Sequence, residues 1–170
     1  GTGDARAPFF TDQDEKRLLY ELSQMSNPNH LRLTKLALTT GFRRSELLSL
    51  TWRNIDLGKK LLYISRKNCA AIDNSSGLRL VPLPGKAQKI LEELQGRGGK
   101  VLELSKGAAR NGFDKTRKKA GLITLRFHDL RHIAISRMWR SGMNALEISA
   151  CSGHRDIKML MRYSHFQLSI

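Results

Sequence analysis

A helix-like spacing of leucines runs through most of this 170-residue chain, but one early stretch interrupts it. Leu18, Leu19 and Leu22 fall on one face of a helix. Residues 54–84 differ, because two β-rich runs at 61–64 and 78–83 flank a polar, turn-rich segment. The sequence therefore predicts an α+β fold, mostly α with a small antiparallel β-sheet of two or three strands inserted early.

Capping and turn residues divide the remainder into helices within one domain. Thr11 followed by Asp14 indicates a helix N-cap with an acidic first turn. We expect residues 1–10 to be a linker or tail and residues 11–170 to form one domain. The chain starts with Gly-Thr-Gly instead of Met, so we expect it to be a piece of a longer protein. Helix breaks or ends are predicted at Pro28–Asn29, Gly41 (with a restart near Ser45), Gly121, Gly142 and Gly153, with a long helix from His128 to Gly142.

The charge balance limits the classes of partner. Thirty Lys and Arg oppose fifteen Asp and Glu, which gives a net charge of +15. Such an excess attracts polyanions, so nucleic acid is the first candidate, an anionic membrane surface the second, and a merely solvated basic surface the alternative. No apolar run is long enough to span a membrane. Cys69 and Cys151 form no CxxC pair, which is typical of reduced thiols in an intracellular protein.

Three residues near the start of the long predicted helix share one face. His128 lies three positions before Arg131 and four before His132, so their side chains are neighbours. A histidine and an arginine together suit an anionic oxygen, although a capping His and a solvated Arg would look the same. We expect no metal, since a zinc site needs at least three protein ligands and no third one is evident.

Three further segments carry chemically useful side chains. Arg43 follows the Gly41 turn with Glu46 close behind, His154 follows Gly153, and Tyr163 comes later. Each has an ordinary alternative: a surface arginine, a turn-capping histidine and a half-buried helix tyrosine. In combination, TGFRRSELLSLTW, HDLRH and GHRDIKMLMRYSH closely resemble the signature of the tyrosine recombinases, or phage integrases, from about Thr11 to Phe166.

That resemblance assigns roles to matching positions. It implies catalytic arginines at Arg43 and Arg131 and a nucleophile at Tyr163. It also implies catalytic histidines at His128 and His154, and a β-hairpin lysine at Lys67. Arg66 is the rival for the lysine's place, and Glu46 and His132 match supporting positions. Ser152 stands where the family usually has Leu, Ile133 where it has Thr or Ala, and the loop after Lys67 is longer than usual.

The implied reaction is metal-free cleavage and religation of DNA through a 3′-phosphotyrosine, without cofactors. Arg43, Arg131 and His154 would hold the non-bridging oxygens. His128 would accept the Tyr163 proton, and Lys67 would protonate the leaving 5′ oxygen. We expect phosphate contacts, with a solvated basic face as the alternative, from Lys115, Arg117, Lys118, Lys119 and Arg126.

The expected partner is double-stranded DNA. By resemblance, an N-terminal DNA-binding domain is absent from this fragment, the full-length protein is a homo-tetramer on DNA, and the fragment alone is a monomer. The expected location is the cytoplasm of a bacterial cell near the nucleoid, with a bacterial or phage gene. Two alternatives are a type IB topoisomerase-like enzyme and a non-catalytic DNA-binding module. The second leaves Arg43 and Lys67 unexplained.

Overall fold

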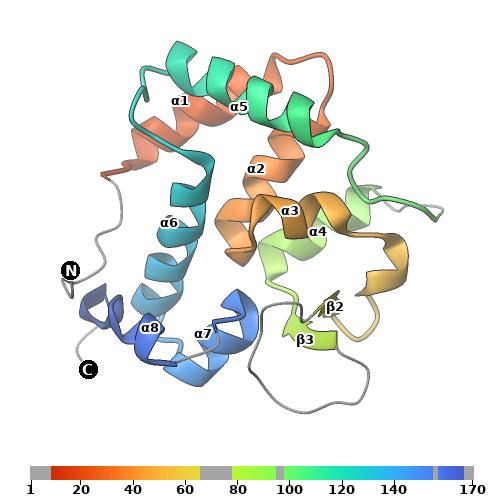
Figure 1. The fold of residues 1–170 in the computed structure, drawn as a ribbon, viewed down its shortest axis with the longest axis vertical. Helices are drawn as coiled ribbons and strands as arrows, with labels where there is room; N and C mark the ends of the chain where they lie inside the picture. The colour runs from red at the N-terminus through yellow and green to blue at the C-terminus, as the bar shows by residue number, and fades with distance from the viewer. Residues whose placement is uncertain (1–8, 66–77, 95–97, 155–156, 167–170) are drawn as a thin grey trace.

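The computed structural model describes residues 9–65, 78–94, 98–154 and 157–166, and most of them are helical (Figure 1). The predicted class, mostly α with a small early antiparallel sheet, is confirmed. The helices are α1 (Asp12–Ser23), α2 (Asn29–Thr40), α3 (Arg44–Ser49), α4 (Gly85–Leu94), α5 (Lys106–Lys119), α6 (Phe127–Arg140), α7 (Ala145–Ser152) and α8 (Ile157–Met161). The strands are β1 (Ile55–Asp56), β2 (Leu61–Ser65) and β3 (Leu78–Pro82), and 3-10 turns lie at Trp52–Asn54 and Ser164–Phe166.

The N-terminal helix begins where its capping residues predict. The Asp14 backbone N–H donates to Thr11 Oγ1, and the Thr11 N–H donates to Asp14 Oδ2, both at 3.0 Å. This reciprocal capping satisfies two N–H groups that the helix itself leaves without partners. Phe10 already packs on the core, so packing begins at the last residue of the predicted tail, whose residues 1–8 lie outside the described part.

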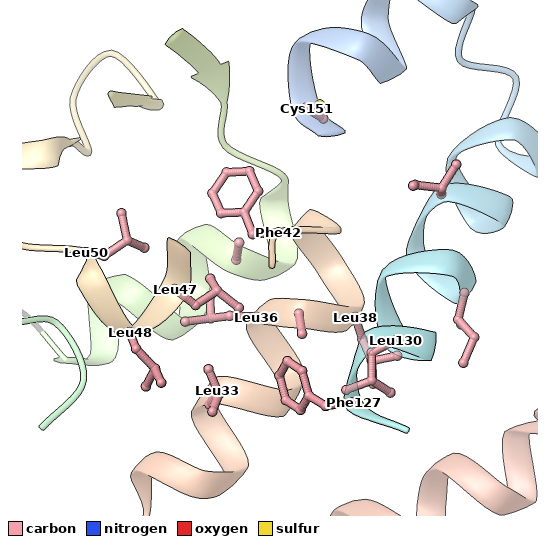
Figure 2. Close-up of a cluster of buried hydrophobic side chains, with 14 of the residues drawn as sticks. Leu33, Leu36, Leu38, Phe42, Leu47, Leu48, Leu50, Phe127, Leu130 and Cys151 are labelled. Carbon is pink, nitrogen blue, oxygen red and sulfur yellow. The ribbon is translucent and has the colours of Figure 1, made fainter. Parts of the chain in front are cut away.

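Helix α2 forms the centre of the molecule and contacts α1, α3, α4, α5 and α6. Leu33, Leu36 and Leu38 of α2 are buried because neighbouring helices cover more than one face of this helix, and each burial contributes about 1.5–3 kcal/mol. Figure 2 shows them between α3 and α6. The labelled members of this cluster on α2, α3, α6 and the segments next to them are Leu33, Leu36, Leu38, Phe42, Leu47, Leu48, Leu50, Phe127 and Leu130.

The sheet has the order β1-β2-β3, and both pairings are antiparallel. Ile64 is paired with Arg79, and Leu62 with Val81; all four side chains are buried. Leu80 points the other way and is 46% exposed. The predicted apolar strand therefore places its one charged residue toward the core, where a guanidinium needs partners.

Two other features complete the fold. Arg137 Nη2 of α6 lies 2.5 Å from Glu15 Oε2 of α1, an ion pair between distant parts of the chain. Cys151 is a buried free thiol, and Cys69 lies outside the described residues. Within the described ranges, every helix is too short or too polar to span a bilayer.

The crossing of α5 over α2 yields a stability prediction. A Cβ at Gly112 would lie 2.3 Å from Cε1 of the buried His30, whereas a Cβ at Gly107 in the same helix would meet no atom within 4 Å. We expect Gly112→Ala to lower the free energy of unfolding by about 1–3 kcal/mol, because the buried His30 ring or the helix that carries it must shift. Gly107→Ala is the matched control, and we expect it to be neutral or to stabilise by up to about 1 kcal/mol. Urea unfolding measures both, and equal effects would contradict the close contact.

Candidate active site

The first turns of α6 bring His128, Arg131 and His132 together, as their spacing predicts. The turn is fixed by the Arg126 backbone N–H, which donates to Asp129 Oδ2 at 2.8 Å. The rings of His128 and His132 meet edge to face with centroids 5.1 Å apart. Burial lowers the pKa of both imidazoles, and the nearby Arg131 charge lowers it further in each. Both rings are therefore held toward their neutral form.

Arg131 is buried with part of its guanidinium in use. Nη1 donates to the Gly41 carbonyl at 2.8 Å, which ties α6 to the end of α2. Nη2 is buried and has no hydrogen-bond acceptor among the described residues. Burial, and next the Arg43 charge, lower the Arg131 pKa to about 10, so the group is still a cation at neutral pH. A buried donor without an acceptor costs about 1–3 kcal/mol, a cost that an anionic ligand would remove.

Arg43 immediately precedes α3, and a hydrogen bond from its backbone N–H fixes its position. Its N–H donates to Glu46 Oε1 at 2.9 Å, while its own guanidinium lies 3.8 Å from that oxygen. The Arg43 side chain is 41% exposed, so its remaining donors are accessible to a ligand. Glu46 thus positions Arg43, and its second oxygen, Oε2, lies 3.5 Å from Arg79 Nη1.

Sequence reasoning did not single out Arg79, which is buried between several parts of the site. Its Nη2 donates to the Cys151 carbonyl of α7 at 3.2 Å, and its guanidinium lies 5.6 Å from the Phe42 ring centroid. A Cβ at Gly153 would stand 2.1 Å from Arg79 Nη1, and Gly153 has φ of 73°. Position 153 therefore suits glycine both for its backbone conformation and for the approach of Arg79. The signal in the sequence that could have identified Arg79 was its position as a single charged residue within an apolar strand.

His154 follows that glycine and contacts Ser152. Its Nδ1 lies 2.7 Å from Ser152 Oγ, and its carbonyl accepts a hydrogen bond from Ser149 Oγ. Burial, then the charges of Arg131 and Arg43, lower the His154 pKa to about 3, so the ring is neutral at physiological pH. When the Ser152 hydroxyl donates to Nδ1, the ring proton resides on Nε2, which is then a donor. The departure from the usual Leu at position 152 thus contacts this histidine directly.

Tyr163 is buried, and its hydroxyl hydrogen-bonds to Nδ1 of His132. The two rings are stacked, with centroids 5.9 Å apart and planes 24° from parallel. Burial raises the Tyr163 pKa, and the charges of Arg162 and Arg131 oppose that rise. The sequence interpretation gave the proton-accepting role to His128 and a supporting role to His132. The structure instead places His132 against the hydroxyl, while His128 contacts the ring of His132.

The structure thus brings five of the residues predicted to be catalytic into one site: Arg43, His128, Arg131, His154 and Tyr163. The Arg43 and Arg131 charges both lower the pKa of His128 and of His154, and the Arg131 charge acts on Tyr163 as well. Lys67 and its rival Arg66 lie outside the described residues. In the part of the chain that the structure describes, no three His, Cys, Asp or Glu side chains are grouped so as to hold a metal ion.

The predicted phosphate-contacting residues differ in their surroundings. Arg117 and Lys118 both pair with Asp114, so part of their charge is neutralised. Arg126 is 83% exposed and lies 4.0 Å from Asp129. Lys115 and Lys119 are exposed on α5. The site itself combines two guanidiniums, three imidazoles held toward neutrality and a tyrosine hydroxyl, a set able to bind an anionic phosphoryl group and activate a nucleophile.

Comparison with known proteins gives relatives of one kind. A shufflon-specific DNA recombinase of Escherichia coli is 36% identical over 135 residues, covering 78% of this chain and 33% of that protein. The integrase of Escherichia phage 186 is 31% identical over 172 residues, covering 97% of this chain and 46% of that protein. This chain therefore spans a third to a half of the length of these relatives.

Solved structures agree with the sequence relatives. The catalytic domain of the bacteriophage HP1 integrase superposes with a TM-score of 0.71 at 25% identity, covering 95% of this chain and 89% of that one. A lambda integrase dimer bound to a core site shares the fold, with a TM-score of 0.64 at 20% identity over 91% of this chain and 58% of that chain. The model of the phage integrase family matches residues 8–169. The chain belongs to the phage integrase family, the tyrosine recombinases.

Proposed function

We propose that this chain is the catalytic domain of a site-specific DNA recombinase, which cleaves and rejoins DNA through a covalent bond to Tyr163. The observation that carries the proposal is the buried Tyr163 hydroxyl held on His132, in the same site as the unsatisfied Nη2 of Arg131. A tyrosine with an ordinary structural role needs neither a base nor neighbouring arginines. The reaction requires both, because the phosphodiester is anionic and a phenol is a weak nucleophile.

Arg43, Arg131 and His154 bind the phosphate in this mechanism. The two guanidiniums donate to non-bridging oxygens, on which negative charge increases in the transition state. His154, neutral and with its proton on Nε2, adds a third donor. Donors held in place before the reaction contribute about 2.7–4 kcal/mol each in comparable sites. The site thereby stabilises the transition state with its own side chains.

Two proton transfers accompany the exchange of bonds. The Tyr163 oxygen forms a bond to phosphorus, and its proton passes to Nδ1 of His132, which contacts the hydroxyl. The bond from phosphorus to the 5′ oxygen breaks, and that oxygen takes a proton from Lys67, whose role comes from the family resemblance alone. The product is a 3′-phosphotyrosine with a free 5′ hydroxyl. Attack by a 5′ hydroxyl reverses these steps and joins the strands without an energy source.

The wider setting follows the two relatives described above, one from a bacterium and one from a phage. The proposal includes double-stranded DNA as substrate, a homo-tetramer of the full-length protein on DNA, and a monomer for the 170-residue chain alone. It also includes action in the bacterial cytoplasm beside the nucleoid.

The proposed function predicts a covalent intermediate between Tyr163 and DNA. We expect the protein, incubated in EDTA with labelled duplex DNA that carries a nick near the cleavage point, to form an SDS-stable protein–DNA band. Tyr163→Phe removes the nucleophile, so no band is expected, although DNA binding is retained. The exposed Tyr20→Phe is the matched control and should cleave normally. A band of equal intensity from Tyr163→Phe, or a band only with added metal, would refute the mechanism.

The contact between Tyr163 and His132 predicts different roles for the two neighbouring histidines. If His132 accepts the Tyr163 proton, His132→Gln should slow phosphotyrosine formation by about a hundredfold or more, and His128→Gln should slow it less. Burial lowers the His132 pKa, so the neutral base persists as pH falls, and the acid limb of kcat/KM should lie below the ordinary value of 6.5. His132→Gln should abolish that limb. A limb that survives in His132→Gln and disappears in His128→Gln would assign the base to His128.

A further inference from the structure

An open pocket of about 490 Å³ lies beside the site, between α3, α5 and the start of α6. Arginines provide much of its lining: Arg44, Arg110, Arg117 and Arg126. Two of them adjoin site residues in sequence, since Arg44 follows Arg43 and Arg126 nearly adjoins His128. The Arg126 charge also contributes to lowering the His128 pKa, so the pocket and the site are close enough to interact electrostatically.

The charges in this pocket do not cancel. Asp114 is the one carboxylate in the lining, and it is already paired with Arg117 and with Lys118. Arg117 is further fixed by donating to the Ile123 carbonyl. Among the described residues, no carboxylate lies within ion-pair distance of Arg44 or Arg110. Arg44, Arg110 and Arg126 therefore line a common space. The one ion pair that offsets their positive charge among the described residues is the weak 4.0 Å contact between Arg126 and Asp129.

Arg44 is held in place by packing. Its guanidinium carbon lies 5.4 Å from the centroid of the Phe127 ring, and that ring is braced edge to face by Phe113 at 5.1 Å. A cation stacked on an aromatic ring keeps its in-plane N–H donors available at its edges. This guanidinium is thus oriented before any ligand arrives, which reduces the entropy lost on binding.

We propose that the pocket formed by Arg44, Arg110 and Arg126 binds a second, non-reacting phosphate of the DNA strand whose neighbouring phosphate is attacked by Tyr163. The inference rests on the proposed function for the identity of the ligand. Each DNA strand carries a charge about every 3.4 Å of helix axis, so a strand placed at the active site brings further phosphates past an adjacent pocket. Holding one of them sets the register of the reacting phosphate.

A phosphate suits this pocket better than the edge of a base. Guanidiniums also bind guanine, and the pocket contains Asn111, which can recognise adenine. A base edge is neutral, however, and would leave the mutual repulsion of three converging cations in place. A phosphate oxygen pair accepts from two guanidiniums at once, and its negative charge offsets part of that repulsion.

The test is the salt dependence of DNA binding by the 170-residue chain, measured by fluorescence anisotropy with two unrelated duplexes between roughly 50 and 200 mM salt. Arg110→Gln and Arg126→Gln are the variants, because both side chains are exposed and neither packs in the core. Lys89→Gln is the control; it removes one charge from an exposed position of α4 outside the pocket.

Each arginine variant should reduce the slope of log K against log salt by about 0.9, the value for one lost phosphate contact. At 0.1 M salt this corresponds to about eightfold weaker binding per residue, to the same extent for both duplexes. Lys89→Gln should match the parent chain. An unchanged slope in the Arg110→Gln/Arg126→Gln double variant would overturn the proposal, and so would weakening confined to one duplex, which indicates base recognition.

The covalent-intermediate assay distinguishes this failure from failure of the proposed function. If the unchanged chain forms phosphotyrosine and the slopes do not change, the pocket does not bind phosphate although the recombinase mechanism holds. If the slopes change as expected and no phosphotyrosine forms, the pocket binds DNA and the catalytic proposal fails.

Discussion

The buried guanidinium of Arg79 is the interaction on which the rest of the site depends. It extends from β3 and lies close to Glu46 of α3. It donates a hydrogen bond to the Cys151 carbonyl of α7 and packs closely on Gly153. These elements come from distant parts of the chain. A buried cation is costly unless each of its faces finds a partner, so the structure that satisfies Arg79 also fixes how the elements meet. Glu46 is shared with Arg43, and Gly153 leads into His154, which links Arg79 to two of the three groups that we propose bind the phosphate.

The electrostatics of the site follow from this packing. Converging arginines and burial both disfavour charged imidazoles, so the histidines are held toward neutrality and can act as proton acceptors or neutral donors. Burial raises the Tyr163 pKa, and the charges of Arg162 and Arg131 oppose that rise by favouring the phenolate. In the proposed mechanism, an incoming phosphate would supply the negative charge that the cluster lacks. In the proposed mechanism, binding of substrate and activation of the nucleophile therefore depend on the same positive charges, and the proposed phosphate pocket beside α5 would extend these charges along the strand.

Local patterns in the sequence predicted much of the fold. The Thr11–Asp14 cap, the helix breaks at Gly41 and Gly153, and the shared face of His128, Arg131 and His132 each depend on neighbours within a few positions. The inward side chain of β3 was not predicted, because alternation alone does not reveal that Arg79, not Leu80, faces the core. The contact between His132 and Tyr163 also escaped prediction, since it joins residues on two elements whose packing is set by tertiary contacts. Lys67 stays a prediction from family resemblance.

The central claim, that Arg79 assembles the site, is tested most directly by measuring phosphotyrosine formation in Arg79→Lys at a temperature where the variant is folded. Lysine keeps the charge but cannot make the planar, several-sided contacts of arginine. Arg137→Lys, in the ion pair between α1 and α6, is the control for replacing a partly exposed, ion-paired arginine elsewhere. We predict that Arg79→Lys slows cleavage by roughly a hundredfold, since small misplacements of catalytic groups are that costly, and that Arg137→Lys cleaves normally. Cleavage by folded Arg79→Lys at the unmodified rate would contradict the account.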